Sequence, residues 1–452
     1  MKKTNEKTHN EYSSPYEFKG RIPLSQAIPL GLQHVMAMFI GNLTPLIIVM
    51  GVCGLTADAG FATLRTALLQ NAMIIAGVVT LIQMFSIGPV GGKVPIVMGT
   101  SSGFLGVLNN TVAACGGGVI AYGAIMGACV VGGIFEGILG AFLKPLRKFF
   151  PPIVTGSVVI AIGLSLLGVG INYFCGGSGK ADYGSLPNLF LGFVVLIVIV
   201  LLKHFTPQNS IFSSSAILFG ILAGYIVAVI MTFVLPNTGV DANGAKYTYS
   251  WVVNFSQIKD AAWIAIPSFM GFGALSDIKI SFQASAIIPI GIMFIVTAIE
   301  TVGDISACIE GGMDREATDT ELSGGVMCDG LGSAFAAFFG VLPNTSFSQN
   351  VGLVSMTKVV NRFAISMGAI FLILCGFCPK IGAIMSIMPQ SVLGGAAVMM
   401  FASILISGIQ LITKEPIGSR EITIISVAIG LGYGLGATTG ATAHLPYYIQ
   451  LI

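Results

Sequence analysis

Charged residues are scarce in this chain. Only 9% of its 452 residues are Asp, Glu, Lys or Arg, whereas a typical soluble domain carries about 25%. Histidine occurs four times and tryptophan twice. With 54% hydrophobic residues and a mean hydropathy of +0.90, the chain is too apolar for an ordinary soluble globular protein. We therefore predict a polytopic membrane protein.

The sequence also lacks the patterns that serve catalysis, metal binding or disulfide bonding. Most of its eight cysteines lie in or beside apolar segments. Cys375 and Cys378 form a C-x-x-C pair, but no His or second Cys pair accompanies them as a zinc site requires, so packing explains them better. No nucleophile–base pair is recognisable. We expect no enzyme, no cofactor and no metal site, and the net charge of +2 gives no indication of nucleic-acid binding.

The start of the sequence also lacks the features of a cleavable signal peptide. Residues 1–23 are polar, and the first apolar run is long and has no small-residue cleavage site. This predicts a cytoplasmic N-terminal tail, and most Lys and Arg residues fall in segments that this orientation places on the cytoplasmic side. The longest non-apolar stretch, 237–282, then forms an outer connection. We predict a multi-pass protein of the cell (plasma or inner) membrane.

What the sequence has in abundance is apolar segments. Most are long enough to cross a hydrocarbon core of about 30 Å as a helix, and some are broken. We place thirteen of them at 24–52, 62–87, 94–113, 117–142, 152–174, 187–203, 211–235, 284–305, 322–341, 343–357, 362–386, 390–412 and 421–437.

Two of these segments are interrupted in the same way by proline, glycine and small polar residues. One runs from Val94 to Gly103 and the other from Leu342 to Gly352, and each is the third crossing of its half. Such a pair indicates an inverted repeat with a binding site at the membrane midplane. Half-helix N-termini there would offer unpaired N–H groups to a ligand. The alternative is two loops that dip from the surface, but apolar residues flank both segments on both sides.

Acidic residues inside the apolar segments are the best indication of function. Glu300 and Asp304 lie four residues apart, so in a helix they share one face and point into one cavity rather than towards lipid. A carboxylate at membrane depth costs about 2.5 kcal/mol or more unless it has a partner. This predicts a substrate or proton path. Glu136, in the fourth segment, is another intramembrane acid, which we interpret as a bracing residue.

Five motifs in this order resemble the nucleobase–ascorbate (nucleobase:cation symporter-2) transporter family. Gln349-Asn350-Val-Gly352, followed by Thr357-Lys358, is similar to the family signature Q/E/P-N-x-G-x4-T-R/K/G. The resemblance covers nearly the whole chain. The other four matches are Gln33-His34, the run from Glu300 to Asp304, the run from Gly324 to Gly330 that contains Asp329, and Pro151 to Gly156.

The resemblance implies an all-α membrane protein with fourteen segments in two inverted repeats of seven. A core domain would move against a gate domain in an elevator-type cycle, usually within a homodimer, and the third and tenth segments would be short strands that lead into half-helices. The first repeat would span 24–236 (core 24–142, gate 152–236) and the second 283–452 (core 283–386, gate 390–452). Because the chain stops at Ile452, the comparison predicts that the last gate helix is missing.

The resemblance also implies a substrate held between the two broken segments. Glu300 can accept hydrogen bonds from two ring N–H groups of an oxopurine, and the Gln349 amide can both donate and accept. We expect backbone N–H groups near Ser101 and Ser102 to complete the recognition and Phe104 to provide aromatic stacking.

The remaining matched residues would form a polar network. Asp304 and Asp329 would bind a coupling proton, or would accept hydrogen bonds that hold segments together, with His34 as their partner. The alternative for His34 is an interior histidine with no such role. Asn350 is expected to brace its half-helix rather than to contact substrate.

The pattern at two positions separates possible substrates. Members that carry uracil tend to have His at the position of Asp304 and Glu at that of Gln349, so this chain resembles the purine branch. Xanthine imported with a proton is our first expectation. The alternatives are a urate (uric acid) or uracil permease, Na⁺ coupling and, more remotely, an anion carrier or channel of the same architecture, against which Glu300 argues.

Overall fold

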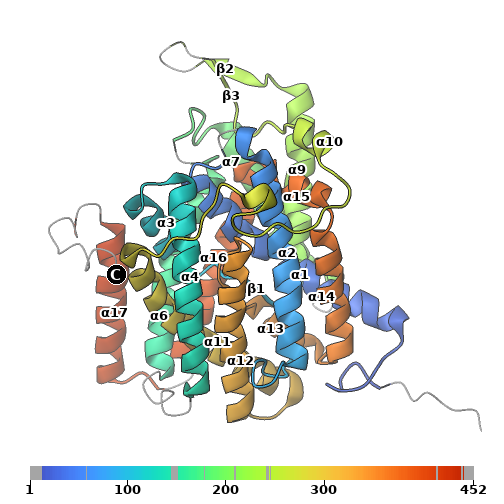
Figure 1. The fold of residues 1–452 in the computed structure, drawn as a ribbon, viewed down its shortest axis with the longest axis vertical. Coiled ribbons are helices and arrows are strands. Elements are labelled where there is room, and N and C mark those ends of the chain that lie inside the picture. Colours follow the sequence, from blue (N-terminus) through green and yellow to red (C-terminus); the bar gives the residue numbers. More distant parts are fainter. Residues whose placement is uncertain are drawn as a thin grey trace, which may run out of the picture.

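The computed structural model describes residues 13–56, 59–143, 151–177, 179–207, 210–240, 244, 246–413, 416–438 and 441. These residues form a bundle of helices with two small antiparallel sheets (Figure 1). In the described ranges, eight helices are long and apolar enough to cross a membrane, or nine if one bent pair counts as a single span. The prediction of a polytopic, mainly helical membrane protein is confirmed.

The first half of the chain begins with a long helix that contains two prolines and continues through a short strand. Proline also lies in the first turn of α6 and of α7, where its missing N–H costs no helical hydrogen bond. The elements are α1 (Leu24–Val52), η1 (Ala59–Phe61), α2 (Ala62–Phe85), β1 (Met98–Thr100), α3 (Leu105–Ala114), α4 (Gly118–Ala141), α6 (Pro152–Phe174), α7 (Leu186–Phe205), α8 (Ile211–Ser214) and α9 (Ala216–Val234).

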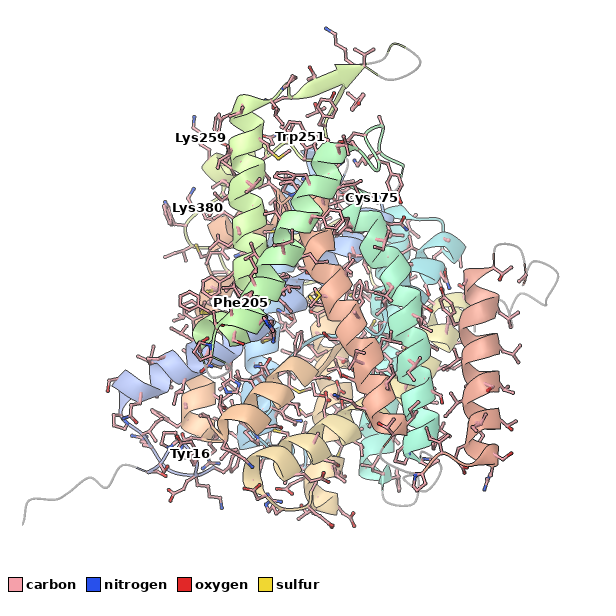
Figure 2. The ribbon with its side chains drawn as sticks, turned by 180° about the vertical axis from the view of Figure 1, so that it is seen from behind. Tyr16, Cys175, Phe205, Trp251, Lys259 and Lys380 are labelled. Atoms are coloured by element: carbon pink, nitrogen blue, oxygen red, sulfur yellow. The ribbon has the colours of Figure 1, made fainter. Side chains whose placement is uncertain are left out.

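The predicted outer connection contains a hairpin of β2 (Thr238–Val240) and β3 (Lys246–Thr248), the short helix α10 (Ser256–Asp260) and the turn η3 (Gly273–Leu275). Figure 2 shows Trp251, Lys259 and Lys380 towards one end of the molecule and Tyr16 towards the opposite end. The connection therefore covers the end that lies away from the N-terminal segment.

The second half of the chain repeats the order of elements of the first half. Two of its elements differ from the segments that we predicted. Its elements are α11 (Ala284–Met313), α12 (Asp319–Phe338), β4 (Asn344–Ser346), α13 (Ser348–Thr357), α14 (Arg362–Gly376), α15 (Pro379–Ser386), α16 (Gln390–Ile412) and α17 (Ser419–Ala437). Segment 362–386 is two helices bent by 81°, because Cys378 is extended before Pro379, as the proline ring favours. The α11 helix continues past residue 305 to Met313, beyond its most apolar part.

The two broken segments meet in the middle of the bundle. Strands β1 and β4 pair antiparallel, with Met98 opposite Ser346 and Thr100 opposite Asn344, and each leads into a ten-residue helix, α3 or α13. Figure 1 shows β1 and α13 enclosed by longer helices. The half-helices predicted from the Pro/Gly pattern are present, and so are the short strands that the family resemblance implies.

One hydroxyl group braces each strand in the same manner. Thr80 of α2 accepts a hydrogen bond from the Met98 N–H (2.9 Å) and donates to the Met98 carbonyl (3.2 Å). Ser333 of α12 does the same for Asn344, at 2.9 Å and 3.1 Å. Away from water, a three-residue strand needs such partners for its backbone groups. The recurrence of this arrangement in both halves reflects the repeat.

The helices pack in two groups. The first group consists of α1 to α4 and α11 to α14, with extensive contacts of α4 on α12 and of α2 on α14. The second group consists of α6, α7, α9, α16 and α17, in which α6 packs along α16 and α7 along α9. Figure 1 shows α17 at the edge of the bundle beside α6. Few contacts join the groups, and a cavity lies between them.

Candidate functional site

The cavity has a volume of about 780 Å³. The first group lines it with the turn after β1, with α11, and with β4 and the start of α13. The second group contributes apolar and hydroxyl side chains, including Val159, Ile217, Met399 and Ser403. The cavity extends to Lys203 and Gln410, near the C-terminal ends of α7 and α16.

Glu300 lies on the cavity wall, opposite the turn that follows β1. A Cβ atom on Gly103 would lie 3.8 Å from the Glu300 Oε2 atom and 3.5 Å from the Ser101 hydroxyl oxygen. The missing side chain at Gly103 therefore leaves open space in front of the carboxylate. Glu300 is half-buried and has no hydrogen bond or ion pair with any described residue, so its oxygens are free to accept hydrogen bonds from a ligand.

Ser101 offers its hydroxyl group rather than its backbone N–H. The N–H donates to the Pro343 carbonyl at 2.8 Å and so extends the pairing of the two strands. The hydroxyl is buried, lines the cavity and has no partner in the described part of the chain. Ser102 also lines the cavity. Both serines therefore line the cavity, and the Ser101 N–H, which we expected to meet the substrate, is already paired with a protein carbonyl.

Asp304 lies one helical turn beyond Glu300, on the same wall. Its carboxylate accepts hydrogen bonds from the Ser346 hydroxyl at 2.6 Å and from the Ser348 hydroxyl at 3.0 and 3.1 Å. Hydrogen bonds to an ionised acceptor are the stronger ones. Asp304 thus joins α11 to the junction of β4 and α13.

Asp329 lies deeper, on α12, and is completely buried. It accepts hydrogen bonds from the hydroxyl groups of Thr301 on α11 and of Thr345 on β4, the latter at 3.4 Å. It is not part of the cavity wall. Asp329 therefore connects α11, α12 and β4 behind the residues that a ligand would contact.

His34 contacts an amide rather than the two aspartates. The Asn350 side-chain amide donates to the His34 carbonyl at 2.8 Å and lies 3.3 Å from the ring atom Nδ1. Within the described ranges, no hydrogen bond joins His34 to Asp304 or Asp329. The α1 helix packs against α13 at this level, and His34 meets Asn350 there. Asn350 is buried and braces α13 against α1, as expected.

Gln349 and Phe104 are the two remaining residues that we predicted to contact the substrate. Gln349 lies in the first turn of α13, beside Ser348, but its side chain is outside the described residues. The Phe104 ring is fully buried against Phe294, with 4.8 Å between ring centroids, and does not line the cavity. Stacking by Phe104 was therefore a wrong expectation, since its ring faces α11. The aromatic residue on the cavity wall is Phe347.

Other residues shape the site although no motif pointed to them. The Asn42 side-chain oxygen on α1 accepts from both the N–H (2.8 Å) and the hydroxyl (3.0 Å) of Thr100. The only feature of the sequence that could have indicated this role of Asn42 is that it is a polar residue in an apolar helix. Among the described residues, no group of three or more His, Cys, Asp or Glu side chains is arranged to hold a metal ion.

Comparisons with known proteins identify relatives of this chain. A family model described as "Permease family" (Xan_ur_permease) matches residues 25–440. A putative purine permease of Clostridium perfringens is 35% identical over 100% of this chain and 91% of its own length. The Bacillus subtilis xanthine permease is 33% identical over 94% and 89%, and the uric acid permease PucK of the same organism is 31% identical over 92% and 87%.

The fold is shared with solved structures of more distant sequence. The transmembrane domain of the cyanobacterial bicarbonate transporter BicA matches with a TM-score of 0.60 at 15% identity. The match covers 91% of this chain and 96% of that domain. At this identity the likeness concerns the fold alone, an arrangement of two inverted repeats of seven segments.

Proposed function

Because the chain belongs to the nucleobase–ascorbate transporter family of permeases, we propose that it imports a purine nucleobase, xanthine in the first place, together with a proton. The observation that carries this proposal is the Glu300 carboxylate. It lies on the wall of a cavity without a protein partner among the described residues, opposite the unpaired Ser101 hydroxyl. A ligand with both N–H donors and carbonyl acceptors complements such a pair of groups.

The chemistry of xanthine suits the described side chains. Glu300 would accept hydrogen bonds from ring N–H groups, and the hydroxyl groups of Ser101 and Ser102 would donate to ring carbonyls. Phe347 would provide an apolar wall for the planar ring, and Gln349 would contribute a donor and an acceptor. A nucleobase that lacks these groups would leave polar atoms of the protein unpaired, which is a strong basis for rejection.

Urate is the second candidate within the same class. It differs from xanthine by one added carbonyl and one added N–H, and the relatives include one protein named for each substrate. The fold neighbour that carries bicarbonate suggests an anion as a third possibility. Bicarbonate has no ring N–H groups to donate to the carboxylates of Glu300 and Asp304 on the cavity wall, so these two acids disfavour it.

Proton coupling is supported by the same two acids. In the described part of the chain neither Glu300 nor Asp304 forms an ion pair with Lys or Arg, and both can be reached from the cavity. When the cavity closes around a substrate and water leaves, an unpaired carboxylate becomes costly, and binding a proton removes that cost. We propose that one of these acids carries the coupled proton; Na⁺ is the alternative ion.

The two groups of helices suggest how the site is exposed. We propose that the first group is the core domain and the second the gate domain, and that the core domain moves along the gate in an elevator-type cycle. The cavity extends to Lys203 and Gln410, on the side that our orientation assigns to the cytoplasm. This structure would then be the inward-facing state. The homodimer that the family resemblance implies stays a prediction.

Radiolabelled xanthine uptake tests the proposal. Cells that lack their own purine permeases would express this chain, with unlabelled urate, hypoxanthine and uracil as competitors and with a protonophore in a parallel sample. We expect saturable uptake that the protonophore abolishes and that urate inhibits more strongly than uracil does. Absence of uptake from cells whose membranes contain the protein, or inhibition by uracil alone, would contradict the proposed substrate.

A further inference from the structure

One acid inside the protein, Glu136, has no part in the proposed binding site. It lies on α4, is completely buried and does not line the cavity. Around it α4 and α12 cross closely, because a Cβ atom on Gly330 would lie 2.5 Å from the Gly133 carbonyl oxygen and 2.8 Å from the backbone carbonyl carbon of Glu136. Glycine at this crossing allows the two backbones to meet, and no space remains for a further side chain.

Hydrogen bonds to the Glu136 carboxyl are few. Oε1 accepts from the Thr297 hydroxyl at 3.2 Å, and that hydroxyl also lies within reach of the Met293 and Phe294 carbonyls, so its single hydrogen is shared among three acceptors. Oε2 has no partner. In the described ranges no Lys or Arg forms an ion pair with Glu136. An ionised Glu136 would therefore be an unpaired buried charge, which costs several kcal/mol.

A second buried acid lies across the crossing. Asp329 precedes Gly330 on α12, and Gly330 meets the α4 backbone at Gly133 and Glu136, so the two acids lie at the same helix crossing. One Asp329 oxygen accepts from two hydroxyl groups, those of Thr301 and Thr345, while the other, Oδ1, has no partner. Two carboxyl groups that share one buried region do not both ionise. Asp329 accepts more hydrogen bonds than Glu136 does, so it is the member suited to carry the charge.

We infer that Glu136 stays protonated throughout the transport cycle and acts as a positioning residue, providing Asp329 with a neutral, polar neighbour. The α3 helix, which also packs on α4, contributes no acid or base. The α11 helix meets Glu136 at Thr297, so the nearest acids on the packed helices are Asp329 on α12 and Glu300 on α11. Only Glu300 and Asp304 line the cavity. Proton exchange during transport would then be confined to those two residues.

The protonation state can be measured without transport. An infrared spectrum of the purified protein, recorded over a pH series, should contain a C=O stretching band of a protonated carboxyl group that persists at the alkaline end. We expect this band to disappear in Glu136→Gln and to remain in Glu300→Gln and Asp304→Asn. A band that titrates with bulk pH, or one that survives in Glu136→Gln, would overturn the inference whatever the substrate proves to be.

Uptake by two variants separates a polar role from mere packing. Glu136→Gln keeps a neutral polar group of the same shape, so uptake and its pH profile should match those of the wild type. Glu136→Met has a similar volume but no polar end, and we expect uptake to fall about tenfold or more, because the buried Asp329 carboxylate would then face an apolar group in place of a polar one. Full uptake by Glu136→Met would show that Glu136 serves packing alone. A shifted pH profile in Glu136→Gln would show that Glu136 exchanges protons during transport.

Discussion

Glu300 and Gly103 face each other across the cavity, with 3.8 Å between the Glu300 Oε2 atom and the point where a Cβ atom would lie on Gly103. The two residues come from opposite repeats, one from α11 and the other from the turn between β1 and α3. The pairing of the two strands brings them together, so the fold itself creates the space in front of the carboxylate.

Filling this space should block the site. Gly103→Ala adds an atom at ordinary contact distance from its neighbours, 3.4 Å or more, and we expect it to retain uptake. Gly103→Leu would extend further into the cavity and should raise the KM for xanthine strongly. Uptake kinetics for the two variants check this, and a normal KM in the leucine variant would show that the substrate binds elsewhere.

Removing the charge of Glu300 should abolish uptake or reduce it at least about tenfold, because an amide replaces an ionised acceptor of two hydrogen bonds. Glu310→Gln is the matched control, since Glu310 is an exposed acid on the same helix. The measurement is xanthine uptake, normalised to the amount of protein in the membrane. Equal uptake by Glu300→Gln and by the control would remove Glu300 from the site.

Changing Gln349 to Glu should alter the choice among nucleobases rather than abolish transport, because the carboxylate can no longer donate a hydrogen bond to a ring carbonyl. Competition of labelled xanthine with urate, hypoxanthine and uracil measures the ranking. An unchanged ranking would argue against a contact between Gln349 and the substrate.

The Ser346 hydroxyl holds Asp304 at 2.6 Å, and Ser346→Ala removes this donor. We expect uptake to fall by about tenfold and the Tm of the purified protein to decrease, because a half-buried carboxylate loses a hydrogen bond of about 1.5–3 kcal/mol. Ser403→Ala is the control, since Ser403 also lines the cavity but donates to a carbonyl of its own helix. If both alanine variants behave alike, Asp304 does not depend on Ser346.

The features that were predictable from the sequence depend on local rules. Proline and glycine in the broken segments predicted the half-helices, the family resemblance added the short strands, and the spacing of Glu300 and Asp304 placed both on one wall. Which way a side chain faces at a junction depends on the neighbouring helix. For that reason the orientation of Phe104 towards α11 and the contact of His34 with Asn350 could not be read from the chain.

The hydroxyl braces illustrate the same limit. Thr80 and Ser333 are ordinary residues within apolar helices, and their role becomes visible only when each is found against the first residue of a strand. Pro379 was a signal for the break in the sequence, but the residues around it are apolar, so we predicted a single segment over 362–386. Family motifs identified the acids of the site and not the groups that hold them.

The most direct test is xanthine transport by the purified protein in liposomes. An imposed pH gradient, acidic outside, would be the only source of energy, and wild type would be compared with Glu300→Gln. We predict accumulation of xanthine above the external concentration in the wild type, its loss when the gradient is collapsed, and none in the variant. Accumulation that is equal in both proteins, or that ignores the pH gradient, would contradict a proton-coupled purine transporter that binds its substrate through Glu300.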